Sequence, residues 1–246
     1  APSGSSPEAV VRLLTNTHST YGFGCWFPAR RKNWELTVKR YLVGGADAQR
    51  SRLLTVAENE DILVNVENGV GVVTLNRPKA INSLNHVMVT GLADALTAWE
   101  HDDSVRAILL TGAGERGLCA GGDVIALRDS AIAGDDNART FWHDEYVLNA
   151  QIGRYPKPYV ALMDGIVMGG GVGVGAHGNI RVVTEKTKMG MPEVGIGFIP
   201  DVGGTYLLSR APGALGLHAA LTGAPISGAD AIALGFADHF VPHEKL

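Results

Sequence analysis

Glu193, Asp201 and three successive glycines lie within residues 163–204, and their spacing could serve chemistry on a carbonyl group. The glycines, residues 169–171, follow an apolar run, so the backbone can approach a ligand where any Cβ would collide. Their N–H groups are then available to bind an oxyanion. Glu193 has apolar neighbours, and a carboxylate in such surroundings can act as a nucleophile or a base. The stretch predicts a site that combines main-chain donors with Glu193 and a second acid, Asp201.

These residues belong to a set of four motifs along the chain. The motifs are NRPKAINSL at 76–84, CAGGD at 119–123, MGGGVG at 168–173, and MPE at 191–193 running on to PDVGG at 200–204. Their content and order resemble the enoyl-CoA hydratase/isomerase (crotonase) superfamily. Within it the chain is most similar to the hydrolases of 3-hydroxyisobutyryl-CoA. The resemblance runs from Glu60 to Leu246.

The resemblance implies an oxyanion hole beside two catalytic acids. It places one N–H donor on Ala120 and the other on Gly170. It assigns the catalytic work to Glu193 and Asp201. The alternative role for the glycines is close packing of a helix on a strand. For Asp201 the alternative is capping of the helix that follows Gly203.

The acids also indicate which reaction the resemblance implies. Hydratases of the superfamily hold one water between two glutamates, and the position of the first is Gly173 in this chain. Glu193 matches the second glutamate, and Asp201 supplies an acid where hydratases commonly have glycine. This pattern resembles that of the hydrolases. It implies that Glu193 attacks the thioester or activates water, while Asp201 positions a hydroxyl or water and moves a proton.

The resemblance implies further contacts with an acyl-CoA substrate. The residues concerned are Glu145, Gly121, Gly122, Asp123, Lys79, Ala80 and Ile81. The loop 79–81 is expected to meet coenzyme A through its main chain, with Lys79 near a phosphate. The alternatives are a solvated helix acid for Glu145, a plain surface lysine for Lys79, and orientation of its own loop for Asp123.

The expected function is hydrolysis of a short 3-hydroxyacyl-CoA, with 3-hydroxyisobutyryl-CoA of valine breakdown as the leading substrate. One alternative is a hydratase or isomerase of the same fold, which needs another acid in place of Gly173. Another is a non-catalytic subunit that binds coenzyme A. No metal or redox cofactor is expected, since the eight histidines show no ligand spacing and coenzyme A is part of the substrate.

The elements that must position these residues alternate between strands and helices. Asn68 and Gly69 separate two β-branched runs and predict a hairpin. The spacing of apolar residues predicts a helix over 85–100, and apolar runs predict strands at 105–110, 159–163, 180–184 and 237–241. Residues 123–156 are expected to be helical, and Ser227 to cap a last helix that ends at Gly235. The order predicts an α/β fold with parallel pairing, compatible with the crotonase-like ββα spiral.

Composition excludes several other classes of protein. The net charge of -4 and the lack of a basic block argue against nucleic acid as a partner. The two cysteines indicate no disulfide framework. No apolar run is long enough to span a bilayer, so we expect a soluble protein of the cytoplasm, or of the mitochondrial matrix if the source is eukaryotic. Assembly of the protein into a homo-oligomer is compatible with the sequence.

The chain divides into two parts by its resemblance. Residues 1–55 match nothing in the family and are expected to be an N-terminal extension of unknown role. Residues 56–246 are expected to be the crotonase-like core that binds acyl-CoA. Hydrolases of the family continue past the matching point with mostly helical residues. We therefore expect the C-terminal helical part to be truncated and the core to be a fragment.

Overall fold

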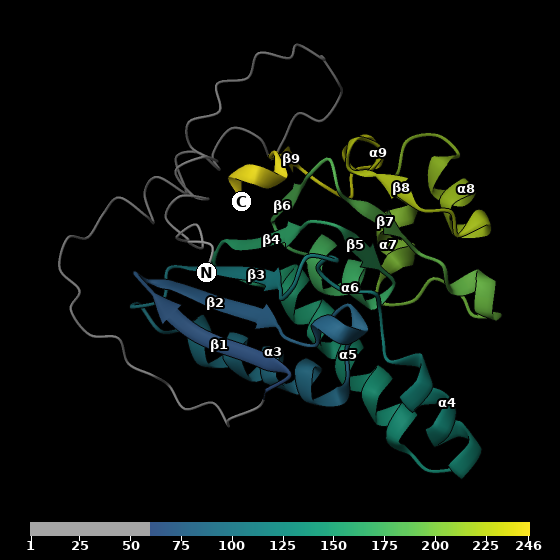
Figure 1. Ribbon diagram of the computed structural model, residues 1–246, viewed down its shortest axis with the longest axis horizontal. Helices are drawn as coiled ribbons and strands as arrows, with labels where there is room; N and C mark the ends of the chain where they lie inside the picture. The colour runs from purple at the N-terminus through teal and green to yellow at the C-terminus, as the bar shows by residue number, and fades with distance from the viewer. Residues whose placement is uncertain (1–59) are drawn as a thin grey trace.

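Residues 60–246 form two β-sheets with helices packed around them in the computed structural model, which describes this part of the chain (Figure 1). The predicted extension, 1–55, lies outside the described residues. The larger sheet has the strand order β1 (Ile62–Glu67), β2 (Val70–Leu75), β3 (Ala107–Gly112), β4 (Tyr159–Met163), β6 (Ile180–Val183) and β9 (His239–Phe240). The smaller sheet has the order β5 (Ile166–Met168), β7 (Lys188–Gly190) and β8 (Ile226–Ser227).

Parallel pairing dominates the larger sheet, as the sequence predicts, whereas the smaller sheet pairs β5 with β7 in parallel and β7 with β8 antiparallel. In the larger sheet β2, β3, β4, β6 and β9 are parallel, and β1 joins β2 as an antiparallel hairpin. The hairpin turn places Asn68 and Gly69 at φ of 52° and 81°, which matches the type I′ turn that Asn-Gly favours. The predicted α/β class is confirmed.

Helices and short 3-10 turns connect these strands within residues 60–246. They are α3 (His86–Glu100), α4 (Val124–Ala133), α5 (Asn137–Arg154), α6 (Gly170–Ala176), α7 (Gly204–Leu208), α8 (Leu215–Thr222) and α9 (Gly228–Leu234), with 3-10 turns η1 (Pro78–Ala80), η2 (Glu193–Ile196) and η3 (His243–Lys245). Ser227 and Asp230 form a capping box at α9, which ends at Gly235 in the left-handed conformation. The predicted last helix is confirmed. No helix within residues 60–246 combines the length and the apolar character needed to cross a bilayer.

Two strand predictions need correction. The strand expected at 105–110 is β3, which starts later because the N–H of Val105 donates to Asp102 O in a turn. Pairing with β2 begins only where Ala107 lies opposite Val70. The strand expected at 237–241 is reduced to β9, since its pairing with β6 covers two residue pairs. The region 123–156 consists of α4 and α5, separated at Gly134.

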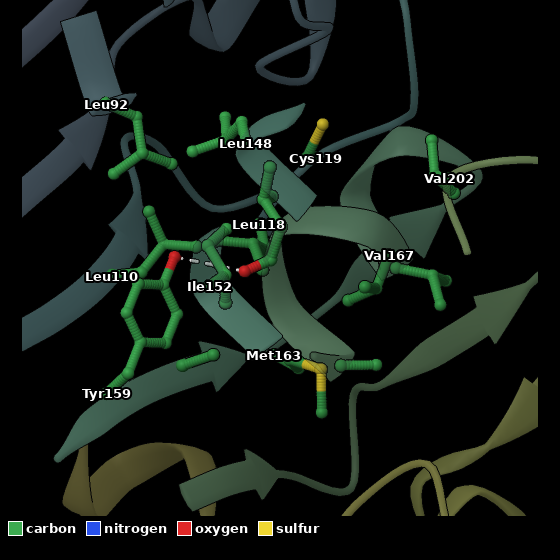
Figure 2. Close-up of a cluster of buried hydrophobic side chains, with 14 of the residues drawn as sticks. Leu92, Leu110, Leu118, Cys119, Leu148, Ile152, Tyr159, Met163, Val167 and Val202 are labelled. Carbon is green, nitrogen blue, oxygen red and sulfur yellow. Dashed lines mark hydrogen bonds between the residues drawn. The ribbon is translucent and has the colours of Figure 1, made fainter. Parts of the chain in front are cut away.

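The main core lies between the larger sheet and the helices α3, α5 and α6. Figure 2 shows Leu92 of α3, Leu110 of β3 and Leu148 of α5 in one buried cluster with Tyr159 and Met163 of β4. The Tyr159 hydroxyl is buried and donates to a main-chain carbonyl of α6 at 3.0 Å. Burying each large apolar side chain contributes roughly 1.5–3 kcal/mol, so this core fixes α5 and α6 firmly beside the strand ends.

One buried polar residue ties the loop 77–84 to the rest of the fold. Asn82 is fully buried at φ 54°, a left-handed conformation that asparagine tolerates. Its side chain accepts from Arg77 N–H and donates to Ala113 O and Gly117 O, each at 3.0 Å. The loop is therefore attached to the segment that leads into the CAGGD motif.

We expect Asn82→Ala to lower the free energy of unfolding by about 2–4 kcal/mol, since it leaves buried polar groups unpaired and places alanine in a left-handed conformation. Urea unfolding followed by circular dichroism measures the change. Asn65→Ala, on the exposed face of β1, is the matched control and should change stability by less than about 0.5 kcal/mol. Equal stability of both variants would contradict the anchoring role of Asn82.

Candidate active site

The turn between β5 and α6 brings a catalytic candidate against the backbone. Gly169 adopts φ 48° and ψ -114°, and a Cβ there would lie 2.7 Å from Glu193 Oε1. Both the conformation and the space exclude a side chain at this position. The carboxyl group of Glu193 therefore occupies the volume that any other residue at 169 would need.

Two main-chain N–H groups beside this turn find no acceptor among the described residues. Gly170 is the first residue of α6, and its N–H has no acceptor within residues 60–246. The N–H of Gly122 also lacks an acceptor in that range. The Gly122 nitrogen lies 3.2 Å from the point where a Cβ of Gly170 would be. Two donors from separate turns thus border one small space, which suits an oxyanion.

The prediction that Ala120 supplies one donor is wrong. Its N–H donates to Ile81 O at 2.9 Å, and this bond attaches the CAGGD loop to the loop 77–84. Two further bonds complete the attachment: Leu84 N–H donates to Gly121 O, and Asp123 N–H donates to Leu84 O. The intervening Gly122 N–H has no acceptor in the described part of the chain, so this residue takes the place expected of Ala120.

Glu193 has the environment that the sequence predicts. Its side chain is buried on η2, and Oε2 has no hydrogen-bond partner among the described residues. Burial, followed by the negative charge of Asp201, raises the pKa of Glu193 to about 7. A carboxyl group with this pKa can both lose and regain a proton near neutral pH.

Glu145 is buried at the same place and is not a solvated helix acid. It lies on α5 with 2% of its surface exposed, and its Oε1 lies 2.7 Å from the point where a Cβ of Gly170 would be. Burial raises its pKa to about 8, and the charges of Asp201 and Glu193 add to the effect. Three carboxyl groups therefore share one site, and Glu145 is expected to be mostly protonated at neutral pH.

Asp201 faces α5 and does not cap α7. The N-cap of α7 is Gly203, and no side chain donates or accepts there. Instead Asp201 Oδ2 accepts a hydrogen bond from the Tyr146 hydroxyl at 2.8 Å. Burial raises the pKa of Asp201, and the Tyr146 bond opposes that rise. The capping alternative is excluded for this residue.

Other predicted contacts are occupied within the protein. Asp123 caps α4 through Ala126 N–H and pairs with Arg77 at 2.9 Å, so its carboxylate orients the loop. The N–H groups of Ala80 and Ile81 donate within the 3-10 turn η1. Lys79 is exposed on this turn. The structure therefore does not bring Asp123 or these N–H groups into the set around Glu193.

Sequence reasoning named Glu145 but missed the other residues on its face of α5. Trp142, Glu145, Tyr146 and Asn149 recur at spacings of three and four, so they share one face of the helix. Trp142 stacks on Phe198 with ring centroids 5.6 Å apart. This spacing is visible in the sequence, although the partners of these side chains are not.

The position of the missing hydratase acid has no room for a side chain. A Cβ on Gly173 would lie 2.7 Å from Val202 Cβ and 2.9 Å from Asn149 Nδ2. Asn149 is buried, and both its polar atoms lack partners among the described residues. Local packing, not only the residue type, thus excludes a glutamate at 173.

Within residues 60–246 no cluster of three His, Cys, Asp or Glu side chains could hold a metal ion.

Comparison with known proteins identifies the class and then the family. The fold is that of the crotonase-like enzymes. An enoyl-CoA hydratase from Rhodobacter sphaeroides 2.4.1 is 45% identical with a TM-score of 0.73, over 75% of this chain and 55% of that one. The family model for enoyl-CoA hydratase/isomerase matches residues 70–246. The chain therefore belongs to the enoyl-CoA hydratase/isomerase family.

Individual relatives carry different names. The mitochondrial 3-hydroxyisobutyryl-CoA hydrolase of Xenopus tropicalis is 49% identical over 192 residues, which is 78% of this chain and 50% of that protein. The human enzyme of the same name is 46% identical over 76% of this chain and 48% of its own length. A structure titled carnitinyl-CoA dehydratase from Mycobacterium thermoresistibile is 80% identical with a TM-score of 0.75, over 76% of this chain and 55% of that one. The chain spans about half the length of the curated relatives it matches.

The raised pKa values of Glu145 and Glu193 predict how stability depends on pH. The folded protein holds these two protons more tightly than the unfolded chain does, so between about pH 4.5 and pH 8 their contribution to stability falls as pH rises. We expect Glu145→Gln to gain stability relative to wild type at the upper end of this window and not at the lower end. Urea unfolding at both ends measures the difference.

The matched control is Glu115→Gln, because Glu115 is exposed on a loop. It should follow wild type at every pH. A Glu145→Gln variant that loses as much stability as wild type between the two ends would contradict the buried, protonated state of Glu145.

Proposed function

We propose that this protein hydrolyses the thioester of 3-hydroxyisobutyryl-CoA, or of a similarly short 3-hydroxyacyl-CoA, to the free acid and coenzyme A. The observation that carries the proposal is the burial of Glu193, within electrostatic reach of Asp201, beside two N–H groups that have no acceptor among the described residues. The absence of space for an acid at Gly173 supports hydrolysis over hydration. The names of the 3-hydroxyisobutyryl-CoA hydrolase relatives agree with this choice.

The proposed reaction begins with the thioester oxygen on the N–H groups of Gly122 and Gly170. Glu193, in its ionised form, adds to the carbonyl carbon, and the resulting oxyanion is stabilised by both donors. The C–S bond then breaks, the departing sulfur takes up a proton, and an acyl anhydride remains on Glu193. Water hydrolyses the anhydride and restores the carboxylate. Alternatively, Glu193 removes a proton from water, which attacks the thioester directly.

The other two acids support this reaction without sharing its central role. Asp201 positions the substrate hydroxyl or the hydrolytic water and moves a proton. Glu145, with its pKa raised to about 8, remains protonated for most molecules near neutral pH. In this state it can donate a hydrogen bond and adds no negative charge beside the oxyanion. The scheme needs no metal or redox cofactor, and coenzyme A enters only as part of the substrate.

A second candidate reaction is hydration or dehydration of an acyl-CoA. The titles of the carnitinyl-CoA dehydratase and enoyl-CoA hydratase structures favour it. The packed Gly173 position weighs against it, because the two-glutamate arrangement cannot form there.

By analogy with the mitochondrial relatives, we propose a location in the mitochondrial matrix if the source is eukaryotic, and in the cytoplasm otherwise.

We expect Glu193→Gln to reduce thiol release from 3-hydroxyisobutyryl-CoA by about 10³-fold or more, because glutamine can neither attack nor accept a proton. Binding of the CoA ester should persist, since the shape of the site is retained. A thiol-reactive dye measures turnover and calorimetry measures binding. Crotonyl-CoA is tested in parallel by loss of its enoyl absorbance.

The outcomes separate the candidates. Thiol release that depends on Glu193 supports the hydrolase. Loss of enoyl absorbance without thiol release would replace it by a hydratase, and binding without either reaction would indicate a non-catalytic subunit. Full thiol release by Glu193→Gln would reject the assignment of this residue.

The donor pair generates a separate prediction. Gly170→Ala places a methyl group 2.7 Å from Glu145 Oε1 and 3.2 Å from the Gly122 nitrogen. We expect this methyl group to block the oxyanion position and to lower kcat/KM by about 10²–10³-fold. Gly153→Ala is the matched control, because a Cβ there meets nothing within 4 Å. Normal turnover by Gly170→Ala would contradict the proposed oxyanion hole.

A further inference from the structure

The segment between η2 and α7, which carries Asp201, makes few main-chain hydrogen bonds among the described residues. Between η2 and α7, Ile199 is 68% exposed. The N–H groups of Ile199, Asp201 and Val202 have no main-chain acceptor within residues 60–246. Val202 has φ 46°, and its carbonyl is bonded to His177 Nε2 at 2.7 Å. Side chains must therefore supply much of what fixes the position of Asp201.

Helix α5 supplies two such contacts one turn apart. The Trp142 ring stacks on Phe198 with an interplanar angle of 16°. The Tyr146 hydroxyl donates to Asp201 Oδ2 at 2.8 Å. Positions 142 and 146 lie on the same face of the helix, and Glu145 lies between them against the glycine turn. Helix α5 thus contacts both the segment that carries Asp201 and the glycine turn, and it can fix their relative positions.

We propose that Tyr146 is a positioning residue that holds the Asp201 carboxylate in the orientation used for turnover. This inference rests on the proposed hydrolase function. The bond occupies Oδ2, so Oδ1 is left to face a hydroxyl or a water molecule. It also favours the ionised form of Asp201, because a donor hydrogen bond lowers the pKa that burial raises. Tyr146 itself stays protonated, since burial and the neighbouring acids raise its own pKa.

The surroundings suit a positioning role better than a packing role. Tyr146 is 39% exposed, so its ring does not belong to the buried core. The hydroxyl is the group that reaches Asp201, and its removal leaves the ring in place. Tyr146→Phe is therefore expected to fold normally.

The test is steady-state hydrolysis of 3-hydroxyisobutyryl-CoA by the full chain. We expect Tyr146→Phe to lower kcat by about tenfold or more and to change KM by less than about twofold, because orientation and not binding is lost. Tyr206→Phe is the matched control: this tyrosine is 55% exposed and contacts Arg210 through its ring. It should retain the wild-type kcat and KM.

A double-mutant cycle tests whether Tyr146 acts through Asp201. In an Asp201→Asn background, adding Tyr146→Phe should change kcat by less than about threefold. A loss of the same size in both backgrounds would overturn the positioning role. A wild-type kcat for Tyr146→Phe would overturn it while leaving the hydrolase intact. No thiol release by wild type would overturn the hydrolase and this inference together.

Discussion

The site depends on the close approach of carboxyl groups to the backbone of two glycines, Gly169 and Gly170. Glu193 places an oxygen 2.7 Å from the point where a Cβ of Gly169 would lie, and Glu145 places one 2.7 Å from the corresponding point of Gly170. A methyl group at either position would push an acid away or close the space between the two free N–H groups. The α5 helix, the glycine turn and the segment after β7 therefore have to be fixed together, and the buried core achieves this.

This arrangement costs stability. Three carboxyl groups with raised pKa values, and a buried asparagine that finds no partner within residues 60–246, are unfavourable in a folded protein. The fold offsets this cost with apolar burial between the larger sheet and its helices. Such a cluster is typical of sites in which pKa values are matched to proton transfer. The same burial that destabilises Glu193 gives it a pKa suited to work near neutral pH.

Local signals were sufficient for much of the fold. Asn68 and Gly69 predicted the hairpin, and the capping box at Ser227 marked α9 correctly. Local patterns also singled out the glycine turn and Glu193 as candidate parts of the site. Ala120 was the wrong choice of donor because a bond to Ile81, distant in sequence, decides which N–H of the CAGGD loop is free. The burial of Glu145 and the partner of Tyr146 likewise depend on segments that only the tertiary structure brings together.

The two halves of the site are attached to the protein in different ways. The N–H groups proposed as oxyanion donors lie on turns that are hydrogen-bonded to neighbouring loops and strands, whereas Asp201 lies on a segment with few main-chain hydrogen bonds among the described residues. Replacing that short segment could alter proton transfer by the acid while the proposed hydrogen bonds to the carbonyl oxygen stay the same. A fold divided in this way can diversify its reactions by local exchange, without rebuilding its scaffold.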